Sequence, residues 1–170
     1  MKGQFSFEQL VSLSIFIVFV TYFFFQFLAL RPVYLKEVKS ERIRAEAYQI
    51  SELLINDPGY PVNWNTNPVQ TQRIGLSDQT LNKVNLLSIY KINELNSQCA
   101  GDGYYNVKKW LGSDFDFSIF LADKPTGSLK INCYPPAIAV KGIKMTIRRI
   151  VAFNDSYGEL TYGELILQMW

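Results

Sequence analysis

The chain has 170 residues, 15% of them aromatic and only 19% charged, and its 17 basic and 15 acidic side chains leave a net charge of +2. Nucleic acid is not an expected partner, because proteins that bind phosphates concentrate Lys and Arg far more strongly. The absence of histidine removes the commonest general base and the commonest metal ligand, so we expect no metal, no cofactor and no catalytic residues.

The first predicted element is a helix that crosses a membrane. From Gln9 to Leu30 the sequence contains no charged residue, and at about 1.5 Å per residue this run is roughly 33 Å long, close to the hydrocarbon thickness of a bilayer. Large apolar side chains such as Phe23, Phe24 and Phe27 occur on all its sides, which excludes a surface helix with one apolar face. The far end reads FLALRPVYLKE and lacks the small residues of a signal-peptidase site, so we expect the helix to be retained.

A single carboxylate, Glu8, stands at the start of this apolar run, after a Lys-Gly pair. The segment KGQFSFEQLVSLS resembles the class III, or prepilin-type, signal peptide of archaeal type IV pilin-like proteins. In that family a prepilin peptidase leaves a mature chain that begins Gln-x-Ser-x-Glu. The resemblance implies cleavage between Gly3 and Gln4, which makes residues 1–3 a leader. Ser12 departs from the pattern, which usually has Leu at that position.

The resemblance also implies a role for Glu8 in assembly. A carboxylate in hydrocarbon costs about 3 kcal/mol and normally finds a partner, and the free N–H groups of the first helical turn offset part of that cost. The α-amine that cleavage creates at Gln4 of a neighbouring subunit would supply the rest and set the register of helices packed in a filament. Ser6 and Gln9 have the spacing of a capping box at this helix start. The alternative for Glu8 is an interfacial residue near the lipid headgroups.

Beyond Pro32 the pattern becomes amphipathic, with apolar residues recurring every three to five positions among Lys, Glu and Arg. We therefore expect a membrane and assembly segment over residues 4–31 and an amphipathic continuation of the helix over residues 32–55. Pro32 is expected to end or kink the first section. The alternative is a separate soluble helix after a break.

Basic residues directly after the apolar run favour the opposite membrane orientation from the one that the resemblance implies. Counted alone, they would place the following domain in the cytoplasm by the positive-inside rule. We follow the motif, because translocated domains override local charge bias, and expect an extracytoplasmic head at the cell surface or in a filament. The basic residues are Arg31, Lys36, Lys39, Arg42 and Arg44.

Residues 56–170 are expected to form one α+β head. In the stretch NDPGYPVNWN, Pro58 and Gly59 suit a type II turn, and the rings of Tyr60 and Trp64 are expected to cover the helix. Carbohydrate binding by these two rings is the less favoured alternative. The stretch is similar to one that recurs in the same archaeal families, with matches at Leu53, Leu54, Pro58, Gly59, Tyr60, Pro61, Asn63 and Trp64.

Two short helices and an antiparallel sheet are predicted in the head. The second helix spans residues 78–97 and is capped by Ser77, and the third spans residues 104–111 and ends at Gly112. The segments FDFSIFLA, SLKINC, MTIRRIVAF and ELTYGELILQMW alternate with period two and are rich in β-formers, so they predict strands. Residues 154–158 suit a hairpin connection between the last two.

Cys99 and Cys133 lack the spacing of a zinc site. In an oxidising compartment they could form one disulfide, worth roughly 3–4 kcal/mol for a loop of about 35 residues; two buried thiols are the alternative. Asn154 begins an Asn-Asp-Ser sequon and is a candidate for N-glycosylation. Asp114 and Asp116 suggest calcium only weakly, because no loop has EF-hand spacing.

The favoured function is a structural subunit, a pilin or minor pilin-like protein of an archaeal type IV-like surface filament. Its partners would be membrane lipid before assembly, the prepilin peptidase, and other subunits through the N-terminal helix. The alternative is a membrane-anchored surface protein that does not polymerise and binds a ligand or partner through its head. An enzyme displayed on a stalk is least favoured, because the sequence has no nucleophile elbow and no phosphate-binding loop.

Overall fold

The computed structural model describes residues 7–78, 85–137, 142–154 and 158–170. The chain divides into two units that adjoin in sequence between Glu41 and Arg42, and each is described separately. The elements are α1 (Phe7–Asn56), two 3₁₀ turns η1 (Trp64–Thr66) and η2 (Pro68–Gln70), β1 (Leu86–Leu87), α2 (Ile89–Gln98), α3 (Gly103–Leu111), β2 (Phe117–Asp123), β3 (Leu129–Cys133), β4 (Met145–Asn154) and β5 (Leu160–Met169).

A long N-terminal helix followed by an α+β head is confirmed. Helix α1 has 50 residues and ends at Asn56, one residue beyond the expected position. Pro32 lies inside this helix, so of the two expectations the end of the first section is wrong, and a kink at Pro32 stays a prediction. A proline removes only one backbone donor, and the residues on both sides of Pro32 continue the helical hydrogen bonding.

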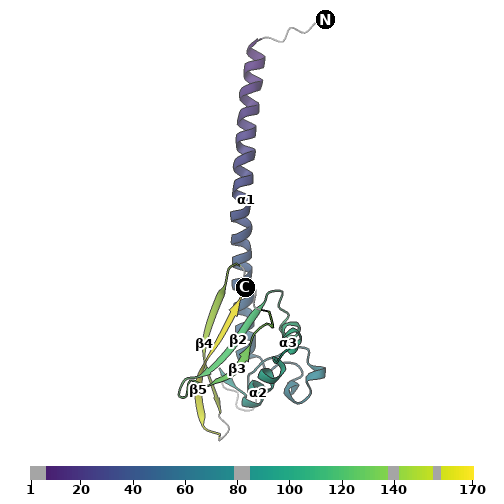
Figure 1. Cartoon of the computed structure of the whole chain (residues 1–170), viewed down its shortest axis with the longest axis vertical. Helices are drawn as coiled ribbons and strands as arrows, with labels where there is room; N and C mark the ends of the chain where they lie inside the picture. The colour runs from purple at the N-terminus through teal and green to yellow at the C-terminus, as the bar shows by residue number, and fades with distance from the viewer. Residues whose placement is uncertain (1–6, 79–84, 138–141, 155–157) are drawn as a thin grey trace. The chain divides into compact units, whose positions relative to one another are not determined.

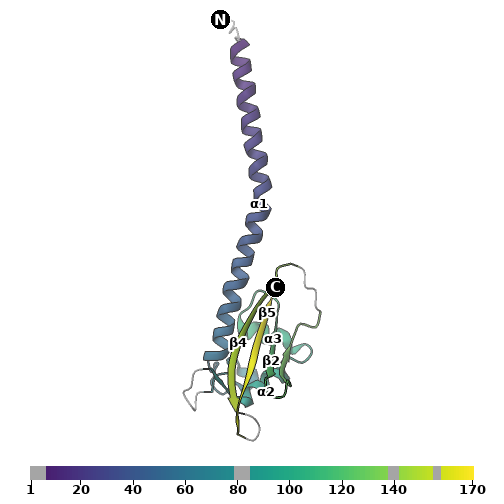
Figure 2. The same cartoon turned by 90° about the vertical axis from the view of Figure 1, so that its left-hand side faces the viewer.

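The five strands form one sheet in the order β1-β4-β5-β2-β3, which Figure 1 shows as a curved layer beside α2 and α3. The pairs β4–β5, β5–β2 and β2–β3 are antiparallel, and all four predicted strands are present. The sheet is nevertheless mixed, because the two-residue strand β1 pairs in parallel with β4 at one edge. Figure 2 shows β4, β5 and β2 of this sheet from a second direction.

Strand β1 also corrects the predicted helix over residues 78–97. The helix observed there, α2, begins only at Ile89 with Ser88, not Ser77, at its N-cap. Asn85 takes a left-handed φ of 59°, and its carbonyl accepts the amide of Ala152 on β4. The backbone at Asn85 thus serves the sheet edge and cannot continue a helix. Residues 79–84, which the prediction included in that helix, lie outside the described residues.

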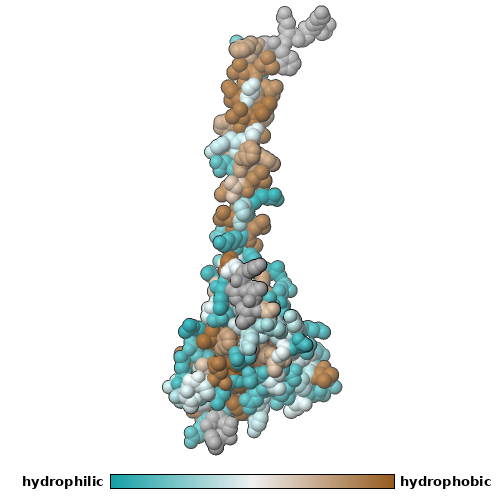
Figure 3. Space-filling model, in the orientation of Figure 1, coloured by the Kyte–Doolittle hydropathy of each residue, from teal (hydrophilic) through white to brown (hydrophobic). Residues whose placement is uncertain are grey.

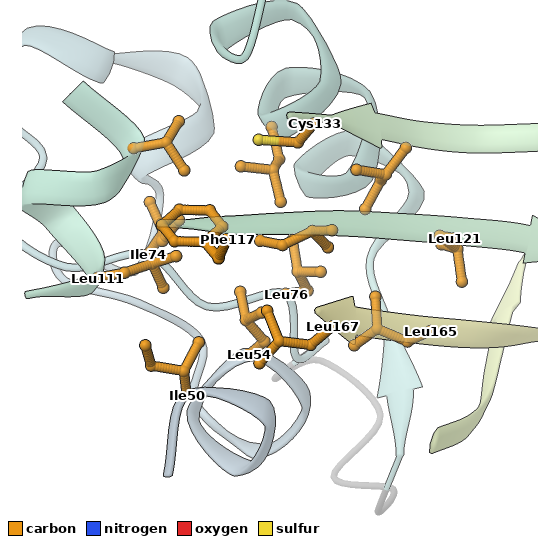
Figure 4. Packing of buried hydrophobic residues seen from close by; sticks show 14 of the residues in the cluster. Ile50, Leu54, Ile74, Leu76, Leu111, Phe117, Leu121, Cys133, Leu165 and Leu167 are labelled. Carbon is orange, nitrogen blue, oxygen red and sulfur yellow. The ribbon is translucent and has the colours of Figure 1, made fainter. Parts of the chain in front are cut away.

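The core of the head lies between the sheet and the last turns of α1. Odd-numbered residues of β2 and β5 face inward, with Ile119 opposite Leu167 and Leu121 opposite Leu165. Figure 4 shows Leu167 beside Leu54 of α1 and Leu76, with Leu165 and Leu121 farther along the sheet. Burying one such aliphatic side chain stabilises the fold by about 1.5–3 kcal/mol. The residues of α1 that are buried in this core are Ile43, Ala47, Ile50, Ser51, Leu54 and Ile55.

The loop after α1 contributes one of its two aromatic rings to this core. Trp64 is fully buried, and its indole N–H donates to the carbonyl of Gly75 at 2.9 Å. Gly59 has a φ of 87°, as a turn with positive φ requires, and its Cα lies against the Trp64 indole. Tyr60 is 57% exposed, so its expected place over the helix is wrong. Burial of Trp64 also removes the alternative in which it binds carbohydrate.

Candidate functional site

The N-terminal part of α1 presents apolar side chains to its surroundings on every side. All side chains from Phe7 to Lys39 are exposed, and Figure 3 shows that the helix surface is mostly brown toward its N-terminal end, with teal polar residues more frequent farther along. Within the described residues, α1 is the one helix long and apolar enough to cross a membrane, judged by length and composition. A soluble protein rarely leaves so large an apolar surface uncovered, so this surface needs lipid or protein around it.

Polar side chains within the apolar run are hydrogen-bonded inside the helix itself. The hydroxyl of Ser14 donates to the carbonyl of Leu10 at 2.8 Å, and that of Thr21 donates to the carbonyl of Ile17 at 2.7 Å. The amide of Gln26 also reaches a side chain one turn back, the hydroxyl of Tyr22, at 3.2 Å. Such internal pairing suits a helix in an apolar medium, where water cannot supply the missing partners.

Glu8 lies in the first turn of α1 and is exposed. It borders an open hollow of about 410 Å³ along the helix surface, together with Phe7, Val11, Ser12 and Ile15. Ser12 also lines the next hollow of about 480 Å³. The serine where the pilin-like pattern has Leu thus leaves room beside the carboxylate for a side chain of a second helix.

The remaining residues predicted for processing and assembly lie outside the described part of the chain. These are Gly3 and Gln4 of the expected cleavage site and Ser6 of the expected capping box. The leader over residues 1–3 and the first three residues of the expected 4–31 segment lie there too. Glu8 is therefore the member of the N-terminal motif that the structure places.

Cys99 and Cys133 form a disulfide, with a Cα–Cα distance of 5.2 Å. It joins the C-cap of α2 to the last residue of β3, and both cysteines are buried in the core. The predicted bridge is confirmed, and the alternative of two buried thiols is not observed. The amide N–H of Asn132, next to the bridge, donates to the side chain of Asn96 at 2.9 Å, which adds a second link between α2 and β3.

Asn154 is the last residue of β4 and pairs with Leu160 across the hairpin. It is half-buried, and the other two residues of its sequon, Asp155 and Ser156, lie outside the described residues. N-glycosylation at Asn154 therefore stays a prediction.

The two acidic residues before β2 are engaged in ion pairs. The carboxylate of Asp114 pairs with the guanidinium of Arg42, and that of Asp116 accepts a hydrogen bond from the ammonium of Lys108 at 2.6 Å. Within the described residues there is no group of three or more His, Cys, Asp or Glu side chains that could hold a metal ion.

Lys91 is a buried polar side chain that, like Tyr104, connects distant segments of the head. Lys91, buried on α2, donates to the carbonyls of Pro58 at 2.7 Å and Ser77 at 3.0 Å, and burial lowers its pKa despite the nearby carboxylates of Asp78 and Asp57. Through these two hydrogen bonds Lys91 connects the loop after α1 with the segment before β1. Lysine is rarely this buried, and nothing in its sequence context predicts the position.

Tyr104 makes a matched pair of hydrogen bonds with the start of β2. Its hydroxyl donates to the carbonyl of Phe117 at 3.2 Å and accepts the amide of the same residue at 3.0 Å. Tyr104 is fully buried, and that burial raises its pKa to about 12. The phenol thus joins α3 to the sheet in its neutral form.

A further hollow of about 540 Å³ lies in the head between η2 with its following loop and one face of α3. Sequence reasoning missed it, although one signal was available. The apolar period of α3 turns Tyr104, Val107 and Leu111 inward, and leaves Trp110 on the edge of the polar face. Its lining residues are Pro68, Val69, Thr71, Gln72, Asn106, Lys109 and Trp110.

Comparisons with protein-family models, with curated proteins and with solved structures yield no match for this chain. Its function is therefore inferred from its residues and their arrangement. Two places carry chemistry of interest: the apolar surface of α1 with Glu8 at one end, and the hollow beside α3.

Proposed function

We propose that the chain is a structural subunit, a pilin or minor pilin-like protein, of an archaeal type IV-like surface filament. It is inserted in the membrane through α1, is cut between Gly3 and Gln4 by a prepilin peptidase, and then packs its N-terminal helix against those of other subunits. The observation that carries the proposal is the fully exposed apolar surface of α1 with one carboxylate, Glu8, in its first turn.

Exchange of lipid for neighbouring helices explains how one apolar surface serves both states. Lipid tails and a packed helix bundle are similarly apolar, so transfer from one to the other involves no large hydrophobic penalty. The gain comes from close side-chain packing, and the hollows beside Ser12 are places where a neighbouring helix can interlock.

Glu8 gives this packing a defined register. A carboxylate left unpaired in an apolar bundle costs about 3 kcal/mol, whereas one that meets a positive α-amine at hydrogen-bond distance recovers that cost. The amine at the new N-terminus of an adjacent subunit is such a partner. Packings shifted along the axis would leave both charges unpaired and are therefore disfavoured.

The disulfide supports an extracytoplasmic head. Disulfides persist in oxidising compartments and are rare in the reducing cytoplasm. The bridge between Cys99 and Cys133 lies in the head, on the C-terminal side of the apolar segment. It therefore favours the orientation that the N-terminal motif implies over the one favoured by the basic residues after Leu30.

N-terminal mass spectrometry of native protein tests the proposal. Material from purified membranes and from sheared cell surfaces should both yield a chain that begins at Gln4, and sheared filaments should contain it in a repeating assembly seen by electron microscopy. A chain that retains Met1, Lys2 and Gly3 in both fractions would contradict processing.

The same experiment separates the alternative, a processed surface protein that stays a monomeric membrane anchor with a binding head. That protein would begin at Gln4 and remain in the membrane fraction, with none in sheared filaments. Accessibility of the head to protease added to intact cells tests the orientation independently of assembly.

A further inference from the structure

The hollow beside α3 has the size of a small-molecule site and lies entirely in the head. Its volume of about 540 Å³ falls within the range of about 300–1,000 Å³ typical of ligand pockets. One wall is α3, where Asn106, Lys109 and Trp110 are spaced three and four residues apart and so share a face. The other wall is formed by η2 and the residues that follow it, among them Thr71 and Gln72.

The polar side chains around this hollow are not used by the described part of the chain. No hydrogen bond or ion pair among the described residues engages the side chains of Gln72, Asn106 or Lys109, and none engages the indole N–H of Trp110. This differs from Lys108, the neighbouring residue on the same helix, which pairs with Asp116 at 2.6 Å.

Thr71 differs from these side chains. It lines the hollow and is only 7% exposed, and its hydroxyl has no hydrogen-bond partner among the described residues. The hydroxyl oxygen is itself enclosed, so it lies out of reach of a molecule in the hollow.

We propose that this hollow binds an acidic saccharide, a sugar ring that carries a carboxylate. Trp110 is half-buried and packs against the core, and the part of its ring that lines the hollow would meet the apolar C–H side of the sugar. The carboxamides of Gln72 and Asn106 both donate to and accept from sugar hydroxyls. Lys109 supplies the positive charge for the carboxylate.

The composition of the lining excludes other common ligands. One lysine without arginine is a weak site for a phosphate group, which proteins usually bind with several cations or a helix N-terminus. Divalent cation sites normally include carboxylates besides carbonyl oxygens, and the lining offers the carboxamide oxygens of Gln72 and Asn106 but no carboxylate. The mixture of one aromatic ring, two amides and one cation fits a hydroxylated and negatively charged ring.

The test is a binding titration of the full chain, held in lipid nanodiscs or in a detergent without a sugar headgroup. Glucuronic acid is the probe, glucose tests the need for the carboxylate, and acetate tests the carboxylate alone. Saturation-transfer NMR of the probe reports binding, and so does a change in the intrinsic fluorescence of the three tryptophans that is absent in Trp110→Phe. We expect glucuronic acid to bind, glucose to bind about fivefold more weakly, and acetate not to bind.

Variants of the lining should change the affinity in distinct ways. Lys109→Gln should remove the preference for glucuronic acid over glucose, and Trp110→Ala should weaken both by at least about tenfold. Trp110→Phe keeps an aromatic ring and replaces the alanine variant if that variant does not fold. We expect Trp110→Phe to lose less affinity for both sugars than Trp110→Ala. Thr71→Val, which keeps the shape of the wall and removes only an enclosed hydroxyl, should bind both sugars as the unchanged chain does.

Matched controls remove the same groups elsewhere. Lys130→Gln removes a lysine charge on β3, and Tyr105→Ala removes an exposed ring on α3 that does not line the hollow. Both should bind as the unchanged chain does. Failure of glucuronic acid to bind, binding that survives both Lys109→Gln and Trp110→Ala, or equal losses in the controls would each overturn the proposal. The inference does not rest on filament assembly, because binding is measured on the full chain before it assembles.

Discussion

At the scale of single residues, the head is specified by polar groups whose positions follow from burial more than from motif. Lys91 and Tyr104 each connect segments distant in sequence through two hydrogen bonds to backbone. Each is costly to bury alone and stable once paired, so each ties the fold to one arrangement. Thr71 is an exception among the buried side chains, because its hydroxyl lacks a partner among the described residues.

Thr71→Val should stabilise the ligand-free protein by about 1 kcal/mol. Valine has the same shape and removes a buried group that has no hydrogen bond in the head. The free energy of unfolding in urea measures the change, with Thr71→Ser, which keeps the hydroxyl, as the control. A loss of stability in the valine variant would mean that the hydroxyl already has a partner in the free protein.

Tyr104 should make the head sensitive to alkali. Its pKa is about 12 in the folded protein and about 10 in the unfolded chain, so the folded state holds the proton more tightly. Between about pH 10 and 12 the unfolded state loses that proton first, and stability falls as the pH rises.

The Tyr104→Phe variant isolates this contribution. At neutral pH it should be less stable by about 1–3 kcal/mol, because the amide and carbonyl of Phe117 lose their partner. The difference from the unchanged chain should shrink between about pH 10 and 12 as the tyrosine contribution disappears. Tyr105→Phe, at an exposed neighbour, should show no such change; a difference that stays constant with pH would contradict the assignment.

At the scale of elements, local patterns account for most helices and strands, and pairing accounts for the rest. The alternation of apolar residues is sufficient for β2 to β5, and Gly112 ends α3 in the left-handed conformation that a C-terminal glycine favours. The two-residue strand β1 has no such pattern, and it exists because Leu86 and Leu87 pair with the far end of β4. For that reason the helix predicted over 78–97 begins only at Ile89, as α2.

Removal of the disulfide should destabilise the head as a whole. Cys99→Ala with Cys133→Ala should lower the free energy of unfolding by about 3–4 kcal/mol, because the unfolded chain gains the freedom of a loop closed across 34 positions. Thermal unfolding of the double variant, compared with the unchanged chain before and after reduction, measures this. Equal stability of the reduced and oxidised chains would show that the bridge contributes nothing.

At the scale of the whole molecule, the chain combines an apolar helical segment with a head that has a polar surface. The apolar part of α1 has no stable place in water, whereas the head has its own core and a polar surface with ion pairs such as Lys124–Glu164, whose hydrogen bond lowers the pKa of the carboxyl group. In the proposed function the two parts have different roles, because the helix holds subunits together and the head faces the exterior.

Glu8→Ala tests this division of roles. We expect insertion, processing and the stability of the head to be unchanged, and the protein in sheared filaments to fall at least about tenfold, because the carboxylate that sets the register is lost. Glu8→Gln, which keeps the shape without the charge, should show the same loss.

Glu37→Ala is the matched control, since it removes an exposed carboxylate from α1 outside the apolar run. Filament recovery should not change in that variant. Normal filaments from Glu8→Ala would contradict the role of Glu8, and equal loss in both variants would point to a general effect of charge on α1.

The sequence by itself determined the apolar helix, the strands with period two, the glycine that ends α3 and the pairing of its only two cysteines. Each of these depends on neighbours a few positions away or on a count of residues. Only the tertiary structure decided the strand order, the edge strand β1, the burial of Lys91 and the hollow between η2 and α3. These depend on which distant segments meet, and the free energy of such contacts is set by the packing of the whole head rather than by any local pattern.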